Sequence, residues 1–226
     1  MTVSTERLSL VFTGILVTCA LVITALVLRR ELSDLLANAA TGAPPRTIAN
    51  WHHLSQDGER VGLADAPVRI VVYSDYQCPF CRQQHTILQD IRARFADRVA
   101  ITFKHVPLMS IHPLARQAAL AAECAARQAR FEAYHNLLFE HQSRLHPGYW
   151  DSLAIEARLP NLEAFRDCME RELPAARIDR HVMQADSLGI RSVPTLVISD
   201  RILQGMRPAQ ELERQILEVM NRQGHR

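Results

Sequence analysis

The core of the expected fold is encoded in residues 68–103, VRIVVYSDYQCPFCRQQHTILQDIRARFADRVAITF. Val68–Tyr73 is rich in β-branched residues and predicts a buried strand. Residues 87–95 then carry apolar side chains at helical spacing, and residues 99–103 alternate as in a second strand. The order strand, helix, strand predicts a parallel βαβ unit.

A C-x-x-C motif, Cys78-Pro79-Phe80-Cys81, lies where the first strand gives way to the helix. A cysteine at a helix N-terminus is favoured as a thiolate, because unpaired backbone N–H groups point toward it. Pro79 suits the first helical turn, and Cys81 lies one turn on, where it can attack a mixed disulfide. The pattern therefore favours redox chemistry over its alternatives, a zinc site, which would need two more ligands, and an inert local disulfide.

The rest of the domain follows on either side of this unit. Residues 113–188 are dense in Ala, Leu, Arg and Gln and predict a block of several helices. Thr195–Ser199 and Arg201–Gln204 predict a hairpin, and a final helix is expected from Pro208. The expected order is β-α-β, helical block, β-β-α within one domain over residues 61–226, which is long enough to bury its own core.

The N-terminal part of the chain predicts a membrane anchor. Leu8–Leu28 holds 21 residues without a charged side chain, enough for a helix to cross a bilayer core. We expect one uncleaved transmembrane helix within residues 1–30 and a spacer over residues 31–60. The alternative is a cleaved secretory signal, with Ala37-Asn38-Ala39 as a small-x-small site.

Two motifs together resemble a known family. Asp75-Tyr76-Gln77-Cys78-Pro79-Phe80-Cys81 is followed more than a hundred residues later by Gly189-Ile190-Arg191-Ser192-Val193-Pro194-Thr195, the second motif. The pair is similar to that of the DsbA-like thiol:disulfide oxidoreductases. The resemblance covers residues 61–226 and implies an α/β fold of the thioredoxin type with an inserted helical domain.

The same resemblance assigns roles to single residues. It implies that Cys78 is the exposed nucleophile and Cys81 the buried resolving thiol, with no metal and no cofactor at the site. It implies a cis peptide bond before Pro194, with the Val193 backbone facing the bound substrate peptide. The expected substrate-binding residues are Pro79, Phe80, Val193, Pro194 and Thr195.

Two positions depart from the pattern of the strongly oxidising parent enzyme. Phe80 stands where that enzyme has a histidine that can help to stabilise the thiolate, and Val72 stands where it has a buried acid. Asp75 is the nearest carboxylate to the motif. It could move protons for Cys81 or be a surface turn residue.

The remaining cysteines bear on the compartment. Cys19 falls within the apolar span, where a small apolar role is expected. If Cys78 pairs with Cys81, then Cys124 and Cys168 are left to form a structural disulfide across the helical block; two free core thiols are the alternative. A disulfide there would indicate an oxidising compartment. The arginines oppose this, because Arg29-Arg30 after the span outnumber the single Arg7 before it and favour a cytoplasmic domain.

Charge and glycine content limit the function classes. Residues 31–226 hold equal numbers of basic and acidic side chains, which argues against a nucleic-acid partner. The eight glycines form no phosphate-binding loop. We therefore expect a disulfide oxidase facing the periplasm or another extracytoplasmic space, with thiol-bearing client proteins. A membrane partner resembling DsbB or a vitamin K epoxide reductase homologue would reoxidise it. The alternatives are a reductase or isomerase kept reduced by a membrane donor, and a metal chaperone.

Overall fold

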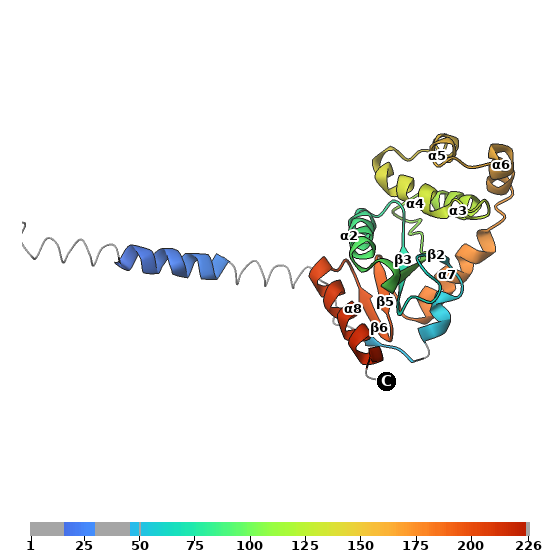
Figure 1. Ribbon diagram of the computed structural model, residues 1–226. Helices are drawn as coiled ribbons and strands as arrows, with labels where there is room; N and C mark the ends of the chain where they lie inside the picture. The colour runs from blue at the N-terminus through green and yellow to red at the C-terminus, as the bar shows by residue number, and fades with distance from the viewer. Residues whose placement is uncertain (1–15, 30–45, 50, 225–226) are drawn as a thin grey trace, which may run out of the picture. The chain divides into compact units, whose positions relative to one another are not determined.

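The computed structural model describes residues 16–29, 46–49 and 51–224, with the N-terminal 41 residues and the remainder forming two separate units (Figure 1). Residues 16–29 are helical. Across the described ranges, no helix combines the length and the apolar content needed to cross a membrane. The predicted span starts at Leu8, and residues 8–15 lie outside the described residues.

A six-stranded sheet forms the centre of the larger unit, with strand order β1-β6-β5-β3-β4-β2. As predicted, β3 and β4 are parallel; each of the other neighbouring pairs is antiparallel. The strands are β1 (Arg46–Thr47), β2 (Glu59–Val61), β3 (Val68–Ser74), β4 (Val99–His105), β5 (Thr195–Ile198) and β6 (Arg201–Gln204).

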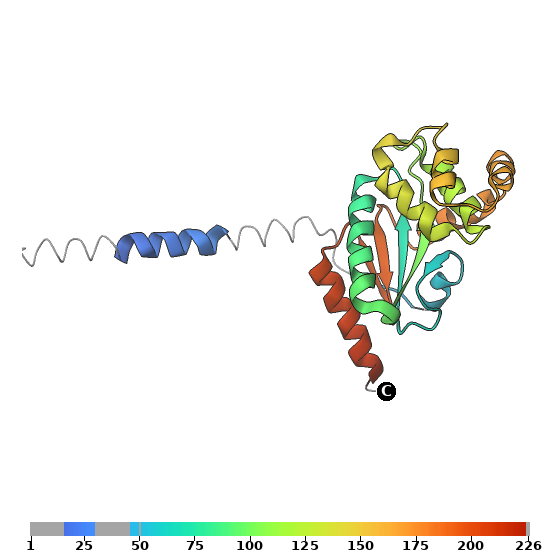
Figure 2. The ribbon, with the colours of Figure 1, turned by 45° about the horizontal axis from the view of Figure 1, so that its top comes forward.

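Helices cover both faces of this sheet (Figure 2). On one face lie α2 (Pro79–Phe95) and α8 (Ala209–Gly224), which pack against alternate side chains of β3 such as Ile70 and Val72. The other residues of β3, Val71 and Tyr73, contact α7 (Ala175–Ser187) and the short helix η1 (Trp51–Ser55). Burial of both faces explains why the β3 sequence is apolar almost without interruption.

In the chain, the helical block follows β4 and precedes α7. In space, it lies over one end of the sheet (Figure 1). It corresponds to the insertion expected near residues 113–188, except that α7 returns to the sheet. Its helices are α3 (Ala115–Ala126), α4 (Phe131–Glu140), α5 (Trp150–Glu156) and α6 (Leu162–Glu170). Two further 3₁₀ turns are η2 (Ala96–Arg98) and η3 (Gln142–Arg144).

The predicted spacer over residues 31–60 is wrong in its C-terminal part. Strand β1 pairs with β6, and β2 pairs with β4 as an edge strand. Between them Leu54 of η1 is fully buried against the sheet. The folded domain therefore includes residues from Arg46 onward, because short backbone ladders and one buried leucine attach this segment to it.

Candidate active site

The C-x-x-C motif lies at the end of β3 that faces the helical block. Cys78 is the N-cap of α2 in extended conformation, and Pro79 occupies the first turn. The Cys78 backbone N–H donates to the Asp75 carbonyl at 3.2 Å, and the Cys78 carbonyl accepts from the Gln142 side chain at 2.9 Å. The loop before the helix is thus held from both sides, and the first thiol is placed at the positive end of α2.

Both thiols are free and both are buried. Cys78 is 5% exposed and Cys81 is 1% exposed. The resemblance implied an exposed Cys78, and the structure corrects this. The Cys78 sulfur lies 3.7 Å from the Val193 carbonyl oxygen, so the loop before β5 covers it.

The two thiols differ sharply in acidity. A hydrogen bond from the Cys81 thiol has the largest influence on the pKa of Cys78, and the backbone N–H groups of Cys81 and Phe80 act in the same direction. Together they lower the pKa of Cys78 to about 6, although desolvation by burial raises it. For Cys81, burial is the largest influence, and the neighbouring Cys78 adds to it, so the pKa of Cys81 is raised well above its usual range. Cys78 is therefore the group that ionises near neutral pH, and Cys81 holds its proton.

The second motif approaches the first from the neighbouring strand. The Val193–Pro194 peptide bond is cis, and the Pro194 carbonyl accepts from the Gly205 N–H at 2.9 Å. Thr195, expected to contact substrate, is instead fully buried, and its hydroxyl donates to the Ser192 carbonyl at 2.7 Å. Its side chain thus supports the loop rather than lining a surface.

The residues between the cysteines face outward. Phe80 is 57% exposed, and Pro79 is also exposed. Val193 and Pro194 are buried beside Cys78. The exposed surface next to Cys78 in the chain is therefore formed by Pro79 and Phe80, while the Cys78 sulfur itself lies against the Val193 carbonyl.

Asp75 is buried, so the surface-turn alternative is wrong. One carboxylate oxygen accepts from the Gln77 N–H at 2.7 Å. The other accepts from the Leu108 N–H at 2.8 Å and lies 2.9 Å from Nδ1 of His112. Its negative charge raises the pKa of Cys78 and so partly opposes the hydrogen bonds. Leu108 and His112 lie more than thirty residues from Asp75 in the sequence, so no local pattern predicts these two partners.

The other three cysteines are not part of the motif. Cys124 of α3 and Cys168 of α6 form a disulfide with a Cα–Cα distance of 5.8 Å. Cys19 is exposed on the separate helical segment. Among the residues that the structure describes, no three His, Cys, Asp or Glu side chains come together as a metal site.

Three comparisons relate the chain to known proteins. A family model described as thioredoxin matches residues 55–218. Among curated proteins, a Na(+)/H(+) antiporter NhaA 3 of Salinispora tropica is 34% identical over 167 residues, covering 73% of this chain and 25% of the antiporter. An NhaA 1 of Salinispora arenicola is 35% identical over 141 residues, covering 62% and 21%. The chain thus spans about a quarter of the length of the curated relatives it matches.

Solved structures show the same fold. BdbD from Bacillus subtilis in its oxidised form has a TM-score of 0.67 at 24% identity, covering 74% of this chain and 94% of BdbD. The thiol-disulfide exchange protein α-DsbA2 from Wolbachia pipientis has a TM-score of 0.67 at 15% identity, covering 75% and 91%. The catalytic domain of Proteus mirabilis ScsC has a TM-score of 0.64 at 22% identity, covering 76% and 95%.

Proposed function

Since this chain belongs to the thioredoxin family, we propose that it is a thiol:disulfide oxidoreductase and acts as a disulfide oxidase. It passes the Cys78–Cys81 disulfide to client proteins outside the cytoplasm. The observation that carries the proposal is the contrast between the two thiols, with the pKa of Cys78 lowered to about 6 and that of Cys81 raised.

The reaction takes two exchange steps. A client thiolate attacks the sulfur of Cys78, the Cys78–Cys81 bond breaks, and Cys81 leaves and takes up a proton. A second client thiolate then attacks the client sulfur of the mixed disulfide, and Cys78 leaves as a thiolate. The client loses two electrons and gains a disulfide, and the enzyme gains two electrons as a dithiol.

The stabilised Cys78 thiolate favours the transfer of electrons from the client to the enzyme. A thiol with a pKa of about 6 is mostly ionised at pH 7, which stabilises the reduced enzyme by about 1.4 kcal/mol relative to an ordinary cysteine. For a two-electron couple this corresponds to about 30 mV toward a more oxidising potential. A more stable reduced enzyme is a better acceptor of client electrons.

The client would bind over the loop beside Cys78. Phe80 and Pro79 offer exposed apolar surface, and Val193 and Pro194 bring a backbone carbonyl to the nucleophile. These residues fit an extended client segment whose cysteine points at Cys78. Thr195 contributes by fixing the loop through the Ser192 carbonyl.

The compartment and the anchor are part of the same proposal. A disulfide between Cys124 and Cys168 is typical of proteins that fold in an oxidising space. The uncharged run Leu8–Leu28 would hold the domain at the membrane, near a quinone-linked partner of the DsbB or vitamin K epoxide reductase type that returns the enzyme to its disulfide form.

A reductase or isomerase role is the second candidate, and Phe80 and Val72 favour it. Phe80 carries no imidazole that could stabilise the thiolate, and Val72 is a buried apolar residue of β3. A metal chaperone using Cys78 and Cys81 is a third. It would show stoichiometric metal in protein purified under reducing conditions, and Cys78→Ser would abolish binding.

The reduction potential of the full chain distinguishes the first two candidates. The protein is equilibrated in glutathione redox buffers, and the fraction of dithiol is measured by thiol labelling. A potential above about −200 mV supports a disulfide donor. A potential near about −270 mV, where reducing thioredoxins lie, would contradict it and support the reductase.

A further inference from the structure

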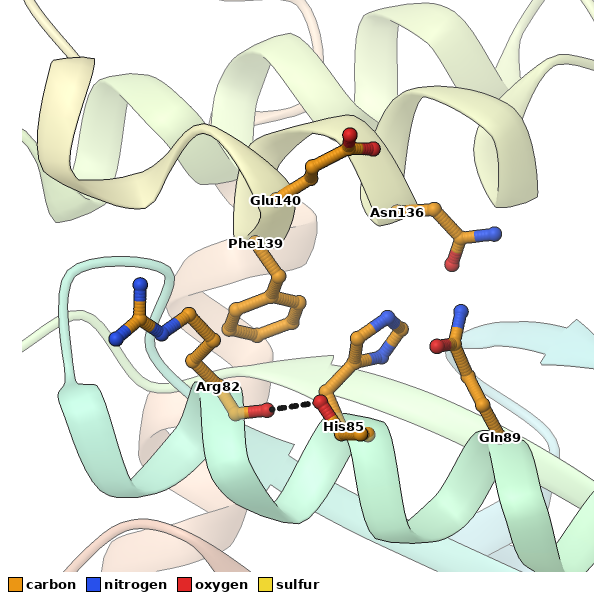
Figure 3. Close-up of a pocket in the computed structure, with 7 residues that line it drawn as sticks. Arg82, His85, Gln89, Asn136, Phe139 and Glu140 are labelled. Carbon is orange, nitrogen blue, oxygen red and sulfur yellow. Dashed lines mark hydrogen bonds between the residues drawn. The ribbon is translucent and has the colours of Figure 1, made fainter.

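A pocket of about 320 Å³ lies between α2 and α4 (Figure 3). In Figure 3 Arg82 lies at one end of the pocket and Gln89 with Asn136 at the other, and the rings of His85 and Phe139 lie between them. The lining residues are Arg82, His85, Thr86, Gln89, Asn136, Phe139 and Glu140. Five of these seven carry charged or amide groups or an imidazole, so the pocket suits a polar ligand.

The pocket begins close to the nucleophile. Arg82, His85 and Gln89 follow Cys78 by four, seven and eleven residues, a spacing that places them along one face of a helix. At about 1.5 Å per residue, they lie roughly 6–16 Å from Cys78 along the axis of α2. A small molecule that extends over this distance could therefore occupy the pocket and still place a sulfur atom at Cys78.

A buried chain of hydrogen bonds ends at the wall of the pocket. The Tyr76 hydroxyl lies 2.7 Å from Nδ1 of His135, and Nε2 of His135 lies 3.2 Å from Nδ1 of His85. Burial lowers the pKa of His85 to about 4 and that of His135 well below its usual range, so both rings are neutral near pH 7.

The direction of these hydrogen bonds is set at Tyr76. Within the described part of the chain, His135 is the one acceptor for the Tyr76 hydroxyl hydrogen. Nδ1 of His135 must then accept, so its Nε2 carries the proton and donates to Nδ1 of His85. His85 is left with a proton on Nε2. That N–H has no partner among the described residues, and the side chain belongs to a residue only 7% exposed that lines the pocket.

Two unpaired charges of opposite sign stand at the rim. Arg82 and Glu140 are both exposed, and neither forms an ion pair with any residue that the structure describes. The His85 N–H that faces the pocket and the Arg82 guanidinium together suit a carboxylate. Glu140 suits an ammonium group, and the amides of Gln89 and Asn136 suit a peptide bond.

We propose that this pocket binds the amino-acid head group of a small peptide thiol, with its carboxylate on His85 and Arg82 and its ammonium on Glu140. An ammonium and a carboxylate on one carbon do not occur inside a polypeptide chain, so the pocket selects a small thiol rather than a client protein. The inference rests on the proposed function and adds a second partner for Cys78.

The exchange with a small thiol takes the same two steps as the exchange with a client protein. The small thiolate attacks the Cys78 sulfur, the Cys78–Cys81 bond breaks, and Cys81 takes up a proton. A second molecule attacks the bound sulfur and leaves as the small disulfide, while Cys78 leaves as a thiolate. Two electrons pass from two small thiols to the enzyme, and the reverse reaction passes them to a small disulfide.

Binding is tested without redox chemistry, using S-methylglutathione and the reduced full chain in a calorimetric titration. The matched variants are Arg82→Gln, Glu140→Gln and Arg214→Gln, the last being an exposed arginine of α8 outside the pocket. Each pocket variant is expected to weaken binding by about two- to fivefold, the range for exposed ion pairs, with Arg214→Gln unchanged. No binding to the unmodified chain, or unaltered binding by Glu140→Gln, would overturn the proposal.

A kinetic experiment separates this inference from the proposed function. The oxidised full chain is reduced with glutathione or with 2-mercaptoethanol, which has no head group. The ratio of the two rates should fall about two- to fivefold in Arg82→Gln and Glu140→Gln; an unchanged ratio contradicts the pocket. Failure of both thiols to reduce Cys78–Cys81 would instead contradict the redox function, whatever the titration shows.

Discussion

Replacing Cys81 by alanine tests the origin of the acidity of Cys78. The hydrogen bond from the Cys81 thiol is the largest influence that lowers the pKa of Cys78 to about 6. Alanine removes this donor and leaves the backbone N–H groups in place. A hydrogen bond to a charged group contributes about 1.5–3 kcal/mol, and one pKa unit is 1.36 kcal/mol. The pKa of Cys78 should therefore rise by about 1–2 units in Cys81→Ala.

The assay follows thiolate absorbance in the ultraviolet as a function of pH. Cys124 and Cys168 are joined in a disulfide and do not titrate, and Cys78→Ala supplies the background from Cys19. The unmodified chain should show a transition near pH 6 that moves upward in Cys81→Ala. A transition that stays near pH 6 in Cys81→Ala would refute the reasoning. So would one that persists in Cys78→Ala, because the acidic thiol would then be Cys81.

Three further outcomes follow from the structure. Asp75→Asn should lower the pKa of Cys78 below about 6 in the same titration, because the carboxylate charge raises it; a rise would contradict this. The double variant Cys124→Ala/Cys168→Ala should lose about 4 kcal/mol of unfolding free energy in urea, since the bond closes a loop with a sequence separation of 44. The pKa of His85 falls from 6.5 to about 4 on folding, so the unfolded state binds its proton first. Stability should decline as the pH falls from 6.5 to 4, by about 3 kcal/mol for this group, and His85→Gln should flatten the decline.

The elements that the sequence predicted are those with a clear local pattern. The β-branched run of β3, the helical spacing within α2 and the parallel pairing of β3 with β4 all agree with the structure. Strands β1 and β2 have two and three residues, too few to show a period, and only their pairing with β6 and β4 makes them strands.

The residues of the candidate site also fall into those that a local sequence pattern predicts and those that depend on distant contacts. The placement of Cys78 at the start of α2 follows from the motif and Pro79. The burial of Asp75 depends on the Leu108 N–H and on His112, and the chain from Tyr76 to His85 passes through His135, 59 residues beyond Tyr76. The contacts of Asp75 arise where the segment between β4 and α3 meets the loop before α2, and those of His135 arise where α4 packs on α2. No local sequence pattern predicts either set.

Trapping of mixed disulfides tests most directly which of the two cysteines forms the bond to the client. The full chain carrying Cys81→Ala or Cys78→Ala is mixed with a reduced unfolded client and a small disulfide, alkylated and resolved by non-reducing mass spectrometry. We predict that a client with a single cysteine is linked through Cys78 in Cys81→Ala, because neither Cys81 nor a second client thiol can release it, and that no adduct forms in Cys78→Ala. A client linked through Cys81 in Cys78→Ala, or full dithiol oxidation by that variant, would contradict it.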